Sequence, residues 1–167
     1  MTKSRAKASS KAPAPASTSR PIKVIAINRR ARFDYELGDK TEAGIALVGT
    51  EVKSLRDGKL NLGDSYCQID RHGEVYLRDA HISPYGQGTH GNHEPLRPRK
   101  LLLNRREIRR MAQRVREKGL TLIPTRMYFK NGRAKVEIAL AKGKRQHDKR
   151  EQIRERDVLR DSQRQLT

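Results

Sequence analysis

The sequence contains no tryptophan, a single cysteine and few aromatic residues of any kind. The lone Cys67 excludes an internal disulfide, argues against a zinc site built from cysteines, and fits a small buried residue. The shortage of aromatic side chains argues against a generic binder of single-stranded nucleic acid, because such proteins stack successive bases on aromatic rings. No apolar run is long enough to span a membrane, and the first residues lack the apolar core of a signal peptide. We therefore expect a cytoplasmic protein without a membrane partner.

Acidic residues are scarce relative to basic ones. Lys and Arg number 38 against 19 Asp and Glu, which gives a formal net charge of +19 and a pI of about 10.7. Such an excess of positive charge predicts a polyanionic partner. Arg (24) outnumbers Lys (14), and the planar guanidinium pairs with phosphates and base edges and stacks on bases, which favours nucleic acid. An acidic membrane surface is the rival partner, but no strongly apolar helix face accompanies the charge.

Sequence signatures of catalysis are also missing. There is no Gly-Lys-Ser/Thr phosphate loop, no His-Glu-x-x-His pair and no dinucleotide fingerprint. The only close histidine pair is His90 and His93, in a glycine-rich segment, and a metal site or a nuclease could use it. No further cysteine completes a ligand set there, and acidic pairs such as Asp34 and Glu36 suit surface or capping roles better than acid–base chemistry. We therefore expect no enzyme, metal, cofactor or small-molecule substrate.

Composition divides the chain into three parts. Residues 1–21 contain no acidic residue and almost nothing to bury, which predicts a disordered basic extension. Residues 22–142 carry the apolar patterning of a folded RNA-binding domain. Residues 143–167 form a basic tail with helix formers but too few apolar residues to fold alone, so we expect the tail to become helical only on a partner.

The folded part reads mainly as β-structure. Two apolar runs, Leu120–Phe129 and Ala134–Ala141, are joined across an Asn-Gly dipeptide, which is typical of a tight hairpin. Ser65–Asp70 and Glu74–Asp79 predict a second hairpin across a segment that contains Gly73.

A third pair of strands is expected nearer the N-terminus. Residues 33–37 and 42–49 alternate in polarity and are linked by Gly-Asp, which predicts an antiparallel pair. Together with the apolar run that begins at Val24, about six short antiparallel strands result. This pattern indicates a small β-barrel of the oligonucleotide-binding type, with a sandwich as the alternative.

Two helices are expected between these strands. Thr50 is placed to cap a short helix over Glu51–Asp57. Asn104 is placed to cap the main helix, with Glu107 at the position of a capping box and Gly119 as its stop. The apolar stripe of the main helix consists of Ile108, Met111, Ala112 and Val115.

The strongest local charge lies on this main helix and its approach. Residues 96–118 contain ten Lys and Arg but only two Glu. A solvated helix face normally mixes charges of both signs, so this bias favours contact with phosphates.

Several blocks of the sequence resemble one family. They are Asn28-Arg29-Arg30-Ala31-Arg32, Glu42-Ala43-Gly44, Glu51-Val52-Lys53-Ser54-Leu55-Arg56, Asp64-Ser65-Tyr66, Arg99-Lys100-Leu101-Leu102-Leu103-Asn104, and Ala141-Lys142-Gly143-Lys144-Arg145-Gln146-His147-Asp148-Lys149-Arg150. In this order they are similar to the SsrA-binding protein (SmpB) family of bacteria, from about Ile25 to about Asp157. The resemblance implies a barrel of the oligonucleotide-binding type with flanking helices.

The resemblance also implies a function. Members bind transfer-messenger RNA at its tRNA-like end and deliver it to stalled ribosomes for trans-translation. Glu42, Leu102 and Asn104 match the RNA-binding surface of the family. We add Arg99, Lys100 and Arg105, which stand beside Leu102 and Asn104 in the sequence, and also Asn28, Arg29 and Arg30. In the family the C-terminal tail enters the empty mRNA channel and the decoding centre of the small subunit. The matching residues are His147, Asp148, Lys149 and Arg150, led by Gly143, Lys144, Arg145 and Gln146.

The implied partners are therefore transfer-messenger RNA and the ribosome with its rRNA, bound by a monomer. The alternative that the residues leave open is a structural ribosomal protein that threads rRNA with its tails.

Overall fold

The computed structural model describes residues 22–86, 91–145 and 154. The elements of this part are, in chain order, β1 (Lys23–Ile27), α1 (Arg29–Asp34), β2 (Tyr35–Ile45), α2 (Gly49–Arg56), β3 (Leu60–Asn61), β4 (Tyr66–Ile69), β5 (Val75–Arg78), β6 (His81–Ile82), β7 (Arg99–Leu102), α3 (Arg105–Lys118), β8 (Thr121–Lys130) and β9 (Arg133–Gly143). Seven of these strands form one antiparallel sheet in the order β1-β8-β4-β5-β7-β2-β9, and β3 pairs separately with β6.

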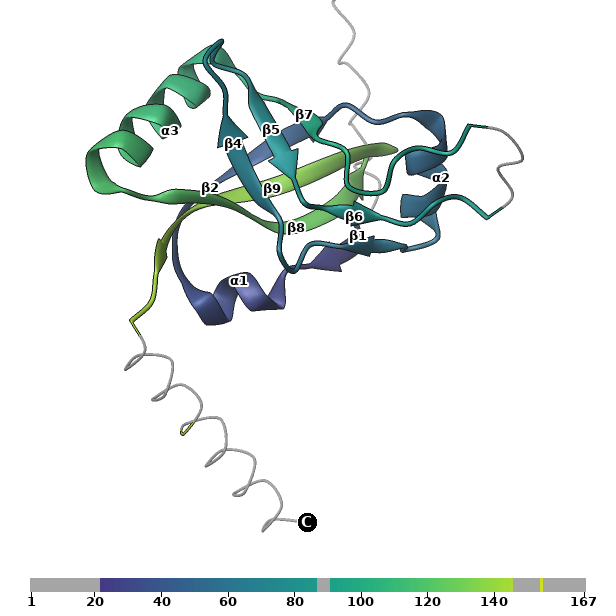
Figure 1. The fold of residues 1–167 in the computed structure, drawn as a ribbon, viewed down its shortest axis with the longest axis horizontal. Coiled ribbons are helices and arrows are strands. Elements are labelled where there is room, and N and C mark those ends of the chain that lie inside the picture. The colour runs from purple at the N-terminus through teal and green to yellow at the C-terminus, as the bar shows by residue number, and fades with distance from the viewer. Residues whose placement is uncertain (1–21, 87–90, 146–153, 155–167) are drawn as a thin grey trace, which may run out of the picture.

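The seven-stranded sheet closes on itself through β8. One side of β8 pairs with β9 along its length, and the other side pairs first with β4 and then with β1. The strands from β8 through β4, β5, β7 and β2 to β9 therefore form a ring, and β1 extends its wall (Figure 1). The expected small antiparallel barrel is confirmed, and ring closure rules out the alternative of a sandwich.

Two of the three expected antiparallel pairs are confirmed, namely the hairpins β8–β9 and β4–β5. Asn131 and Gly132, which connect β8 and β9, have φ of +52° and +75°, as a two-residue hairpin turn of this kind requires. In the turn between β4 and β5, the Asp70 carboxylate accepts hydrogen bonds from the backbone N–H groups of His72 (2.9 Å) and Glu74 (2.8 Å). Aspartate thereby fixes the turn through its own side chain, as it does in many short loops.

The expected hairpin between residues 33–37 and 42–49 is wrong. Tyr35–Ile45 is one continuous strand, and its pairing with β9 shifts between Leu37 and Lys40. Gly38 lies in this bulge, where an added Cβ would come within 3.3 Å of the Leu140 carbonyl oxygen. A glycine inside a strand pattern can mark a bulge or a close approach of two backbones as well as a turn, and here it marks the bulge.

The main helix α3 agrees with its prediction. The Glu107 carboxylate accepts a hydrogen bond from the Asn104 N–H at 2.9 Å, and Gly119 ends the helix with φ of +58°. Met111 is buried, and Ile108 and Val115 pack against the barrel core from the same stripe.

The other two helices differ from what the sequence predicted. α2 begins at Gly49, and its first turn is held by the Glu51 carboxylate, which accepts from the Val48 N–H at 2.9 Å. The predicted cap, Thr50, instead places its hydroxyl 3.0 Å from Nδ1 of His93. α1 was not predicted, because its short, mostly charged sequence has no apolar periodicity.

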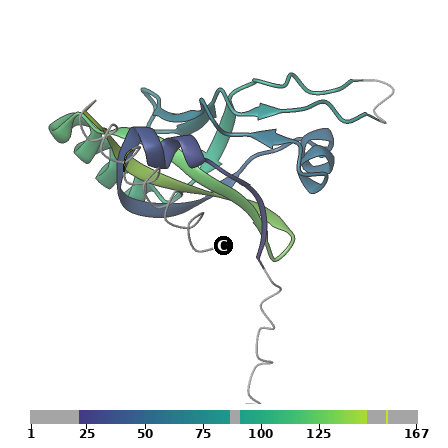
Figure 2. The ribbon, with the colours of Figure 1, turned by 90° about the horizontal axis from the view of Figure 1, so that it is seen from below.

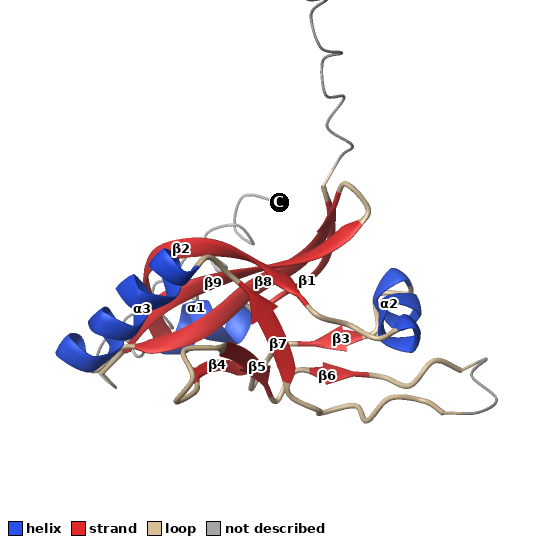
Figure 3. Ribbon diagram, turned by 90° about the horizontal axis from the view of Figure 1, so that it is seen from above, coloured by secondary structure: helices blue, strands red, loops and turns tan. Residues whose placement is uncertain are grey.

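The three helices lie on different sides of the barrel. α3 and α2 sit at opposite ends of the molecule (Figures 1 and 3). α1 lies across the wall formed by β8 and β9, where Ala31 packs against Ile123 and Ala141 (Figure 2). The barrel interior holds the largest buried apolar side chains, among them Leu77, Ile82, Met127 and Ile138, and also Cys67. Burial raises the pKa of the Cys67 thiol, which keeps it protonated.

Candidate nucleic-acid interface

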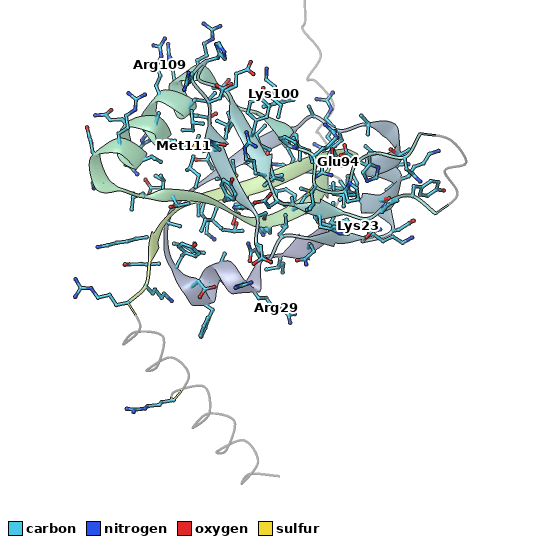
Figure 4. All side chains as sticks on the ribbon, in the orientation of Figure 1. Lys23, Arg29, Glu94, Lys100, Arg109 and Met111 are labelled. Carbon is cyan, nitrogen blue, oxygen red and sulfur yellow. The ribbon has the colours of Figure 1, made fainter. Side chains whose placement is uncertain are left out.

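An open groove runs along the outer wall of the barrel beside the first turn of α3. It is lined by Glu42, Gly44, His72, Gly73, Glu74, Lys100, Leu101, Leu102, Leu103, Asn104, Arg105, Glu107, Ile108, Arg109 and Lys135. β2 turns Ala43 inward, so Glu42 and Gly44 on either side of it face the groove. Figure 4 shows Lys100 and Arg109 on this same side of the molecule. The groove therefore combines a polar floor with a basic helix along one wall.

Five of the nine residues predicted to bind RNA line this groove: Glu42, Lys100, Leu102, Asn104 and Arg105. They come from two distant segments of the chain. The antiparallel pairing of β2 with β7, in which Gly44 is opposite Leu102, brings the segments together.

Glu42 is held by three side chains from β8 and β9. Its Oε2 accepts hydrogen bonds from the hydroxyl of Tyr128 (2.5 Å) and from Nζ of Lys130 (3.0 Å), while Nζ of Lys135 lies 3.6 Å from Oε1. The Tyr128 hydrogen bond, followed by that of Lys130, lowers the pKa of Glu42. Burial and the bond to Glu42 raise the pKa of Tyr128 to about 12. Glu42 therefore presents a negative acceptor in a basic groove.

Lys100 on β7 is paired with Glu74, which stands just before β5. Its ammonium pairs with the Glu74 carboxylate, which also accepts from the Tyr76 hydroxyl at 2.8 Å. The bond from Lys100 lowers the pKa of Glu74 and, in turn, the bond to Glu74 raises the pKa of Lys100. This pair links β7 to the turn between β4 and β5 without removing either charge from solvent.

Leu102 is an apolar side chain in a largely polar groove, and it is 56% exposed. It lies over Gly44, where an added Cβ would come within 3.1 Å of the Leu102 Cβ. Gly44 thus allows the two strands to bring Leu102 flat against β2.

The start of α3 closes the groove. Asn104 precedes the helix, and the exposed guanidinium groups of Arg105 and Arg109 follow it. The backbone N–H groups and the dipole of a helix N-terminus favour anions, so the helix adds to the attraction that these arginines exert on phosphates.

Arg99 has a structural role in place of the predicted RNA contact. β7 alternates, so Lys100 faces outward while Arg99 is 0% exposed. Its guanidinium donates to Glu51 Oε1 (2.8 Å) and to the carbonyl oxygens of Ala80 (2.5 Å) and Pro95 (2.9 Å). Each of its three nitrogens is bonded inside the fold and none of the side chain is exposed, so the prediction that Arg99 binds RNA is corrected.

The partner of Arg99 is equally buried. Glu51 is 0% exposed and also accepts two hydrogen bonds from Arg97, at 2.9 and 2.5 Å. Burial alone would raise the pKa of Glu51, but the bonds from Arg97, the Val48 N–H and Arg99 outweigh it and lower the pKa. The cluster fastens α2 to the segment that precedes β7.

Asn28 is a second correction. Its side chain is 2% exposed, donates to the carbonyl oxygens of Leu62 (2.7 Å) and Pro124 (3.1 Å), and accepts from the Ala31 N–H (2.9 Å). Asn28 therefore caps α1 and fastens it to the residue after β3 and to β8, which leaves no polar side-chain atom for RNA.

Arg29 and Arg30 are exposed on α1 and do not line the groove. Figure 4 shows Arg29 on the side of the molecule away from Lys100 and Arg109. Arg30 pairs with Asp34 and Asp64. These two arginines belong to a different surface, beside the point where β9 ends.

The first residues of the predicted tail are tied to that surface. Gly143 still pairs with Tyr35 in the sheet, so β9 continues past residue 142. The backbone N–H of Lys144 donates to the Asp34 carbonyl oxygen and its Nζ to the Arg32 carbonyl oxygen, both at 3.0 Å. Arg145 is the next residue described. The predicted contacts Gln146, His147, Asp148, Lys149 and Arg150 lie outside the described residues.

Sequence reasoning missed several groove residues, namely Gly44, His72, Gly73, Glu74 and Lys135, and also Tyr128 beneath Glu42. His72 and Gly73 read only as turn residues, because nothing local shows that the turn faces α3.

Both ring nitrogens of His93 are engaged inside the fold, by Thr50 and by the Ile82 carbonyl oxygen at 3.2 Å, while His90 lies outside the described residues. Over residues 22–86 and 91–145, no three His, Cys, Asp or Glu side chains gather as a metal site would require.

None of the helices described is long and apolar enough to cross a membrane. A closed small barrel, with a polar groove edged by a basic helix, defines a nucleic-acid-binding protein of the oligonucleotide-binding type.

Comparison with known proteins narrows this class. Residues 25–167 match the family model described as SmpB protein. The SsrA-binding protein of Moorella thermoacetica is 58% identical over 148 residues, which are 88% of this chain and 95% of that protein. The SsrA-binding protein of Syntrophomonas wolfei is 56% identical over 145 residues, which are 87% of this chain and 92% of that protein. This chain belongs to the SmpB family.

A solved structure agrees with this assignment. It is described as "tmRNA-SmpB: a journey to the center of the bacterial ribosome" and is 49% identical in sequence. The match covers 77% of this chain and 94% of that chain, with a TM-score of 0.62.

Proposed function

We propose that this protein binds transfer-messenger RNA and delivers it to stalled ribosomes for trans-translation, in the cytoplasm and without catalysing a reaction. The single observation that carries the proposal is the groove in which Glu42, Lys100, Leu102, Asn104 and Arg105 meet. The SsrA-binding relatives and the tmRNA–SmpB structure support it independently.

Each kind of side chain in the groove suits one feature of a folded RNA. Lys100, Arg105 and Arg109 supply the positive charge that attracts phosphates. The ionised Glu42 accepts hydrogen bonds from N–H groups on base edges or from the O–H of a ribose 2′-hydroxyl, and a lysine or arginine cannot do so because it has no acceptor atom. Leu102 offers an apolar contact to a base or sugar. This combination reads the shape and edges of a structured RNA.

The tail has a separate role in the proposal. The barrel domain, from residue 22 to the end of β9, holds the RNA, while Gly143, Lys144 and Arg145 direct the chain away beside α1. Gln146, His147, Asp148, Lys149 and Arg150 then act in the decoding centre and the empty mRNA channel. Arg29 and Arg30, which lie beside the start of the tail, contact rRNA. Residues 1–21 add nonspecific attraction to RNA.

A reversal of charge at Glu42 tests the groove. If RNA is attracted only by net positive charge, Glu42→Lys should strengthen binding, because it adds two positive units to the groove. If Glu42 accepts specific hydrogen bonds, the same change should weaken binding to transcribed transfer-messenger RNA by roughly tenfold or more, as filter binding at fixed salt would measure. Glu36→Lys is the matched control, because Glu36 is an exposed β2 residue that pairs with Lys142 outside the groove. Equal behaviour of the two variants would refute the proposed interface.

Truncation after Arg145 tests the division of labour. The truncated protein should bind transfer-messenger RNA within about twofold of the full chain, because the groove is complete. Tagging of stalled peptides by translation extracts should be lost. Normal tagging by the truncated protein would refute the role of the tail.

A further inference from the structure

A carboxylate in a groove that binds a polyanion needs an explanation. An exposed, unpaired Glu42 would repel phosphates and would turn freely among its rotamers, so it would bind RNA poorly. The structure instead surrounds it with groups from two strands of the barrel wall.

The groups that face Glu42 are of two kinds. From β8, Tyr128 donates its hydroxyl to Oε2, and Lys130 bridges Oε2 (3.0 Å) and Oε1 (3.3 Å). From β9, Lys135 stands 3.6 Å from Oε1. The two lysines outweigh the single negative charge, so this part of the groove remains positive overall.

Glu137 is the other acidic group nearby, since it is the register partner of Glu42 on β9. Like charges directly opposite each other destabilise a sheet. Glu137 has its own partners, however: the Thr125 hydroxyl at 2.7 Å, the Arg126 guanidinium at 2.9 Å and Nζ of Lys40 at 3.3 Å. Glu137 therefore takes no donor from Glu42. Across the groove, Lys100 and Glu74 are bonded to each other.

Tyr128 differs from the lysines in one respect, because it cannot move away. It is 3% exposed and its ring is packed in the wall, with the Arg126 guanidinium 5.3 Å from the ring centroid. A long lysine side chain can swing towards an incoming phosphate, whereas the phenol is fixed. An ionised carboxylate has about four lone-pair positions. The Tyr128 hydroxyl occupies one on Oε2 and Lys130 occupies one on each oxygen, so one position on Oε1 is open, and the positions held by Lys130 become available when that lysine turns towards a phosphate.

Resting on the function proposed above, we infer that Tyr128 is a positioning residue of the RNA interface: its fixed hydroxyl holds the Glu42 carboxylate in one orientation, so that the remaining acceptor positions meet base or ribose donors of the RNA. Lys130 and Lys135 compensate the negative charge of Glu42. When RNA binds, these lysines turn towards its phosphates, and the Glu42 carboxylate is then open to the groove as a hydrogen-bond acceptor. The downward shift of the Glu42 pKa agrees with this arrangement.

A double-mutant cycle tests the inference. Tyr128→Phe removes only the hydroxyl and keeps the buried ring, and Glu42→Ala removes the group to be positioned. Filter binding of transcribed transfer-messenger RNA at fixed salt is measured for the full-length wild type, both single variants and the double variant. We expect Tyr128→Phe to weaken binding by about tenfold when Glu42 is present, and by less than about twofold in the Glu42→Ala background. Tyr66→Phe is the matched control, because it makes the same chemical change on β4, outside the groove, and should leave binding unchanged.

A second measurement separates positioning from a purely structural role. The pKa of Glu42, followed through the carbon-13 resonance of its carboxyl group, should rise in Tyr128→Phe and stay unchanged in Tyr66→Phe. If Tyr128→Phe weakens binding equally in both backgrounds, or not at all, the inference is overturned. If Glu42→Ala itself leaves RNA binding unchanged, the groove is not the interface, and it is the proposed function that fails.

Discussion

Gly44 on β2 and Leu102 on β7 are cross-strand partners so close that a Cβ at position 44 would displace the Leu102 side chain. A methyl group there would approach the Leu102 Cβ to 3.1 Å, so Leu102 would have to shift by a few tenths of an ångström. Since Leu102 is the exposed apolar group of the groove, the glycine shapes the groove rather than the core.

The first prediction concerns this pair. Gly44→Ala should weaken binding of transfer-messenger RNA by about threefold to tenfold, because it displaces Leu102, while lowering the stability of the barrel by no more than about 1 kcal/mol. Filter binding and urea denaturation measure the two effects. Adding Gly44→Ala to Leu102→Ala should cost no further affinity, because the displaced group is already gone. An additive loss in the double variant would contradict this explanation.

The second prediction concerns the buried cluster of Glu51, Arg97 and Arg99. Glu51→Gln should destabilise the protein by about 3–5 kcal/mol, because it leaves the buried Arg99 guanidinium without its counter-charge. Urea denaturation measures the change. Glu94→Gln, an exposed substitution in the same region, should change the free energy of unfolding by less than about 0.5 kcal/mol. Similar values for the two variants would show that the buried pair adds little.

The same carboxylate predicts how stability depends on pH. The pKa of Glu51 is lower in the folded protein than its ordinary value, so the unfolded chain takes up the proton first as pH falls. The contribution of Glu51 is therefore complete above the unfolded value of about 4.3 and is lost as pH falls through the lower folded value. Chemical denaturation from pH 7 to pH 3 should show a steeper acid decline for the wild type than for Glu51→Gln. Parallel declines would contradict the prediction.

Local sequence patterns predicted two hairpins, β4–β5 and β8–β9, together with α3 and the barrel, because these features depend on periodicity and turn chemistry over a few residues. They could not predict α1, since a six-residue helix is decided by a buried Asn28 cap whose other partners are 34 and 96 positions away. Arg99 was misassigned for a related reason. A basic residue in a basic segment was expected to be exposed, but the alternation of β7 places Arg99 inside, bonded to Glu51. The groove residues of the β4–β5 turn were missed because only ring closure brings that turn beside α3.

A fourth prediction separates two residues that stand together in sequence. Asn28→Ala should destabilise the protein by about 1–3 kcal/mol, because it removes the cap of α1 and the buried hydrogen bonds that the Asn28 amide donates to the carbonyl groups of Leu62 and Pro124. Arg29→Ala should leave the free energy of unfolding within about 0.5 kcal/mol of the wild type, since Arg29 is exposed. Thermal or urea unfolding distinguishes them. A large loss for Arg29→Ala, with none for Asn28→Ala, would reverse the roles assigned here.

The last prediction concerns the start of the tail. Lys144 is the residue at which the chain leaves the sheet, and its Nζ donates to the Arg32 carbonyl oxygen at the end of α1, where a cation is also favoured by the helix dipole. Lys144→Met keeps the length of the side chain and removes this bond, so the tail should leave the barrel in a less defined direction. Binding of transfer-messenger RNA should stay within about twofold, whereas tagging of stalled peptides should fall several-fold, because a tail that is poorly aimed finds the mRNA channel less often. Lys144→Arg should largely restore tagging, and Lys142→Met, the same change two residues earlier on the exposed face of β9, should have little effect on it. Equal losses for Lys142→Met and Lys144→Met would show that charge near the tail matters and that the anchor on α1 does not.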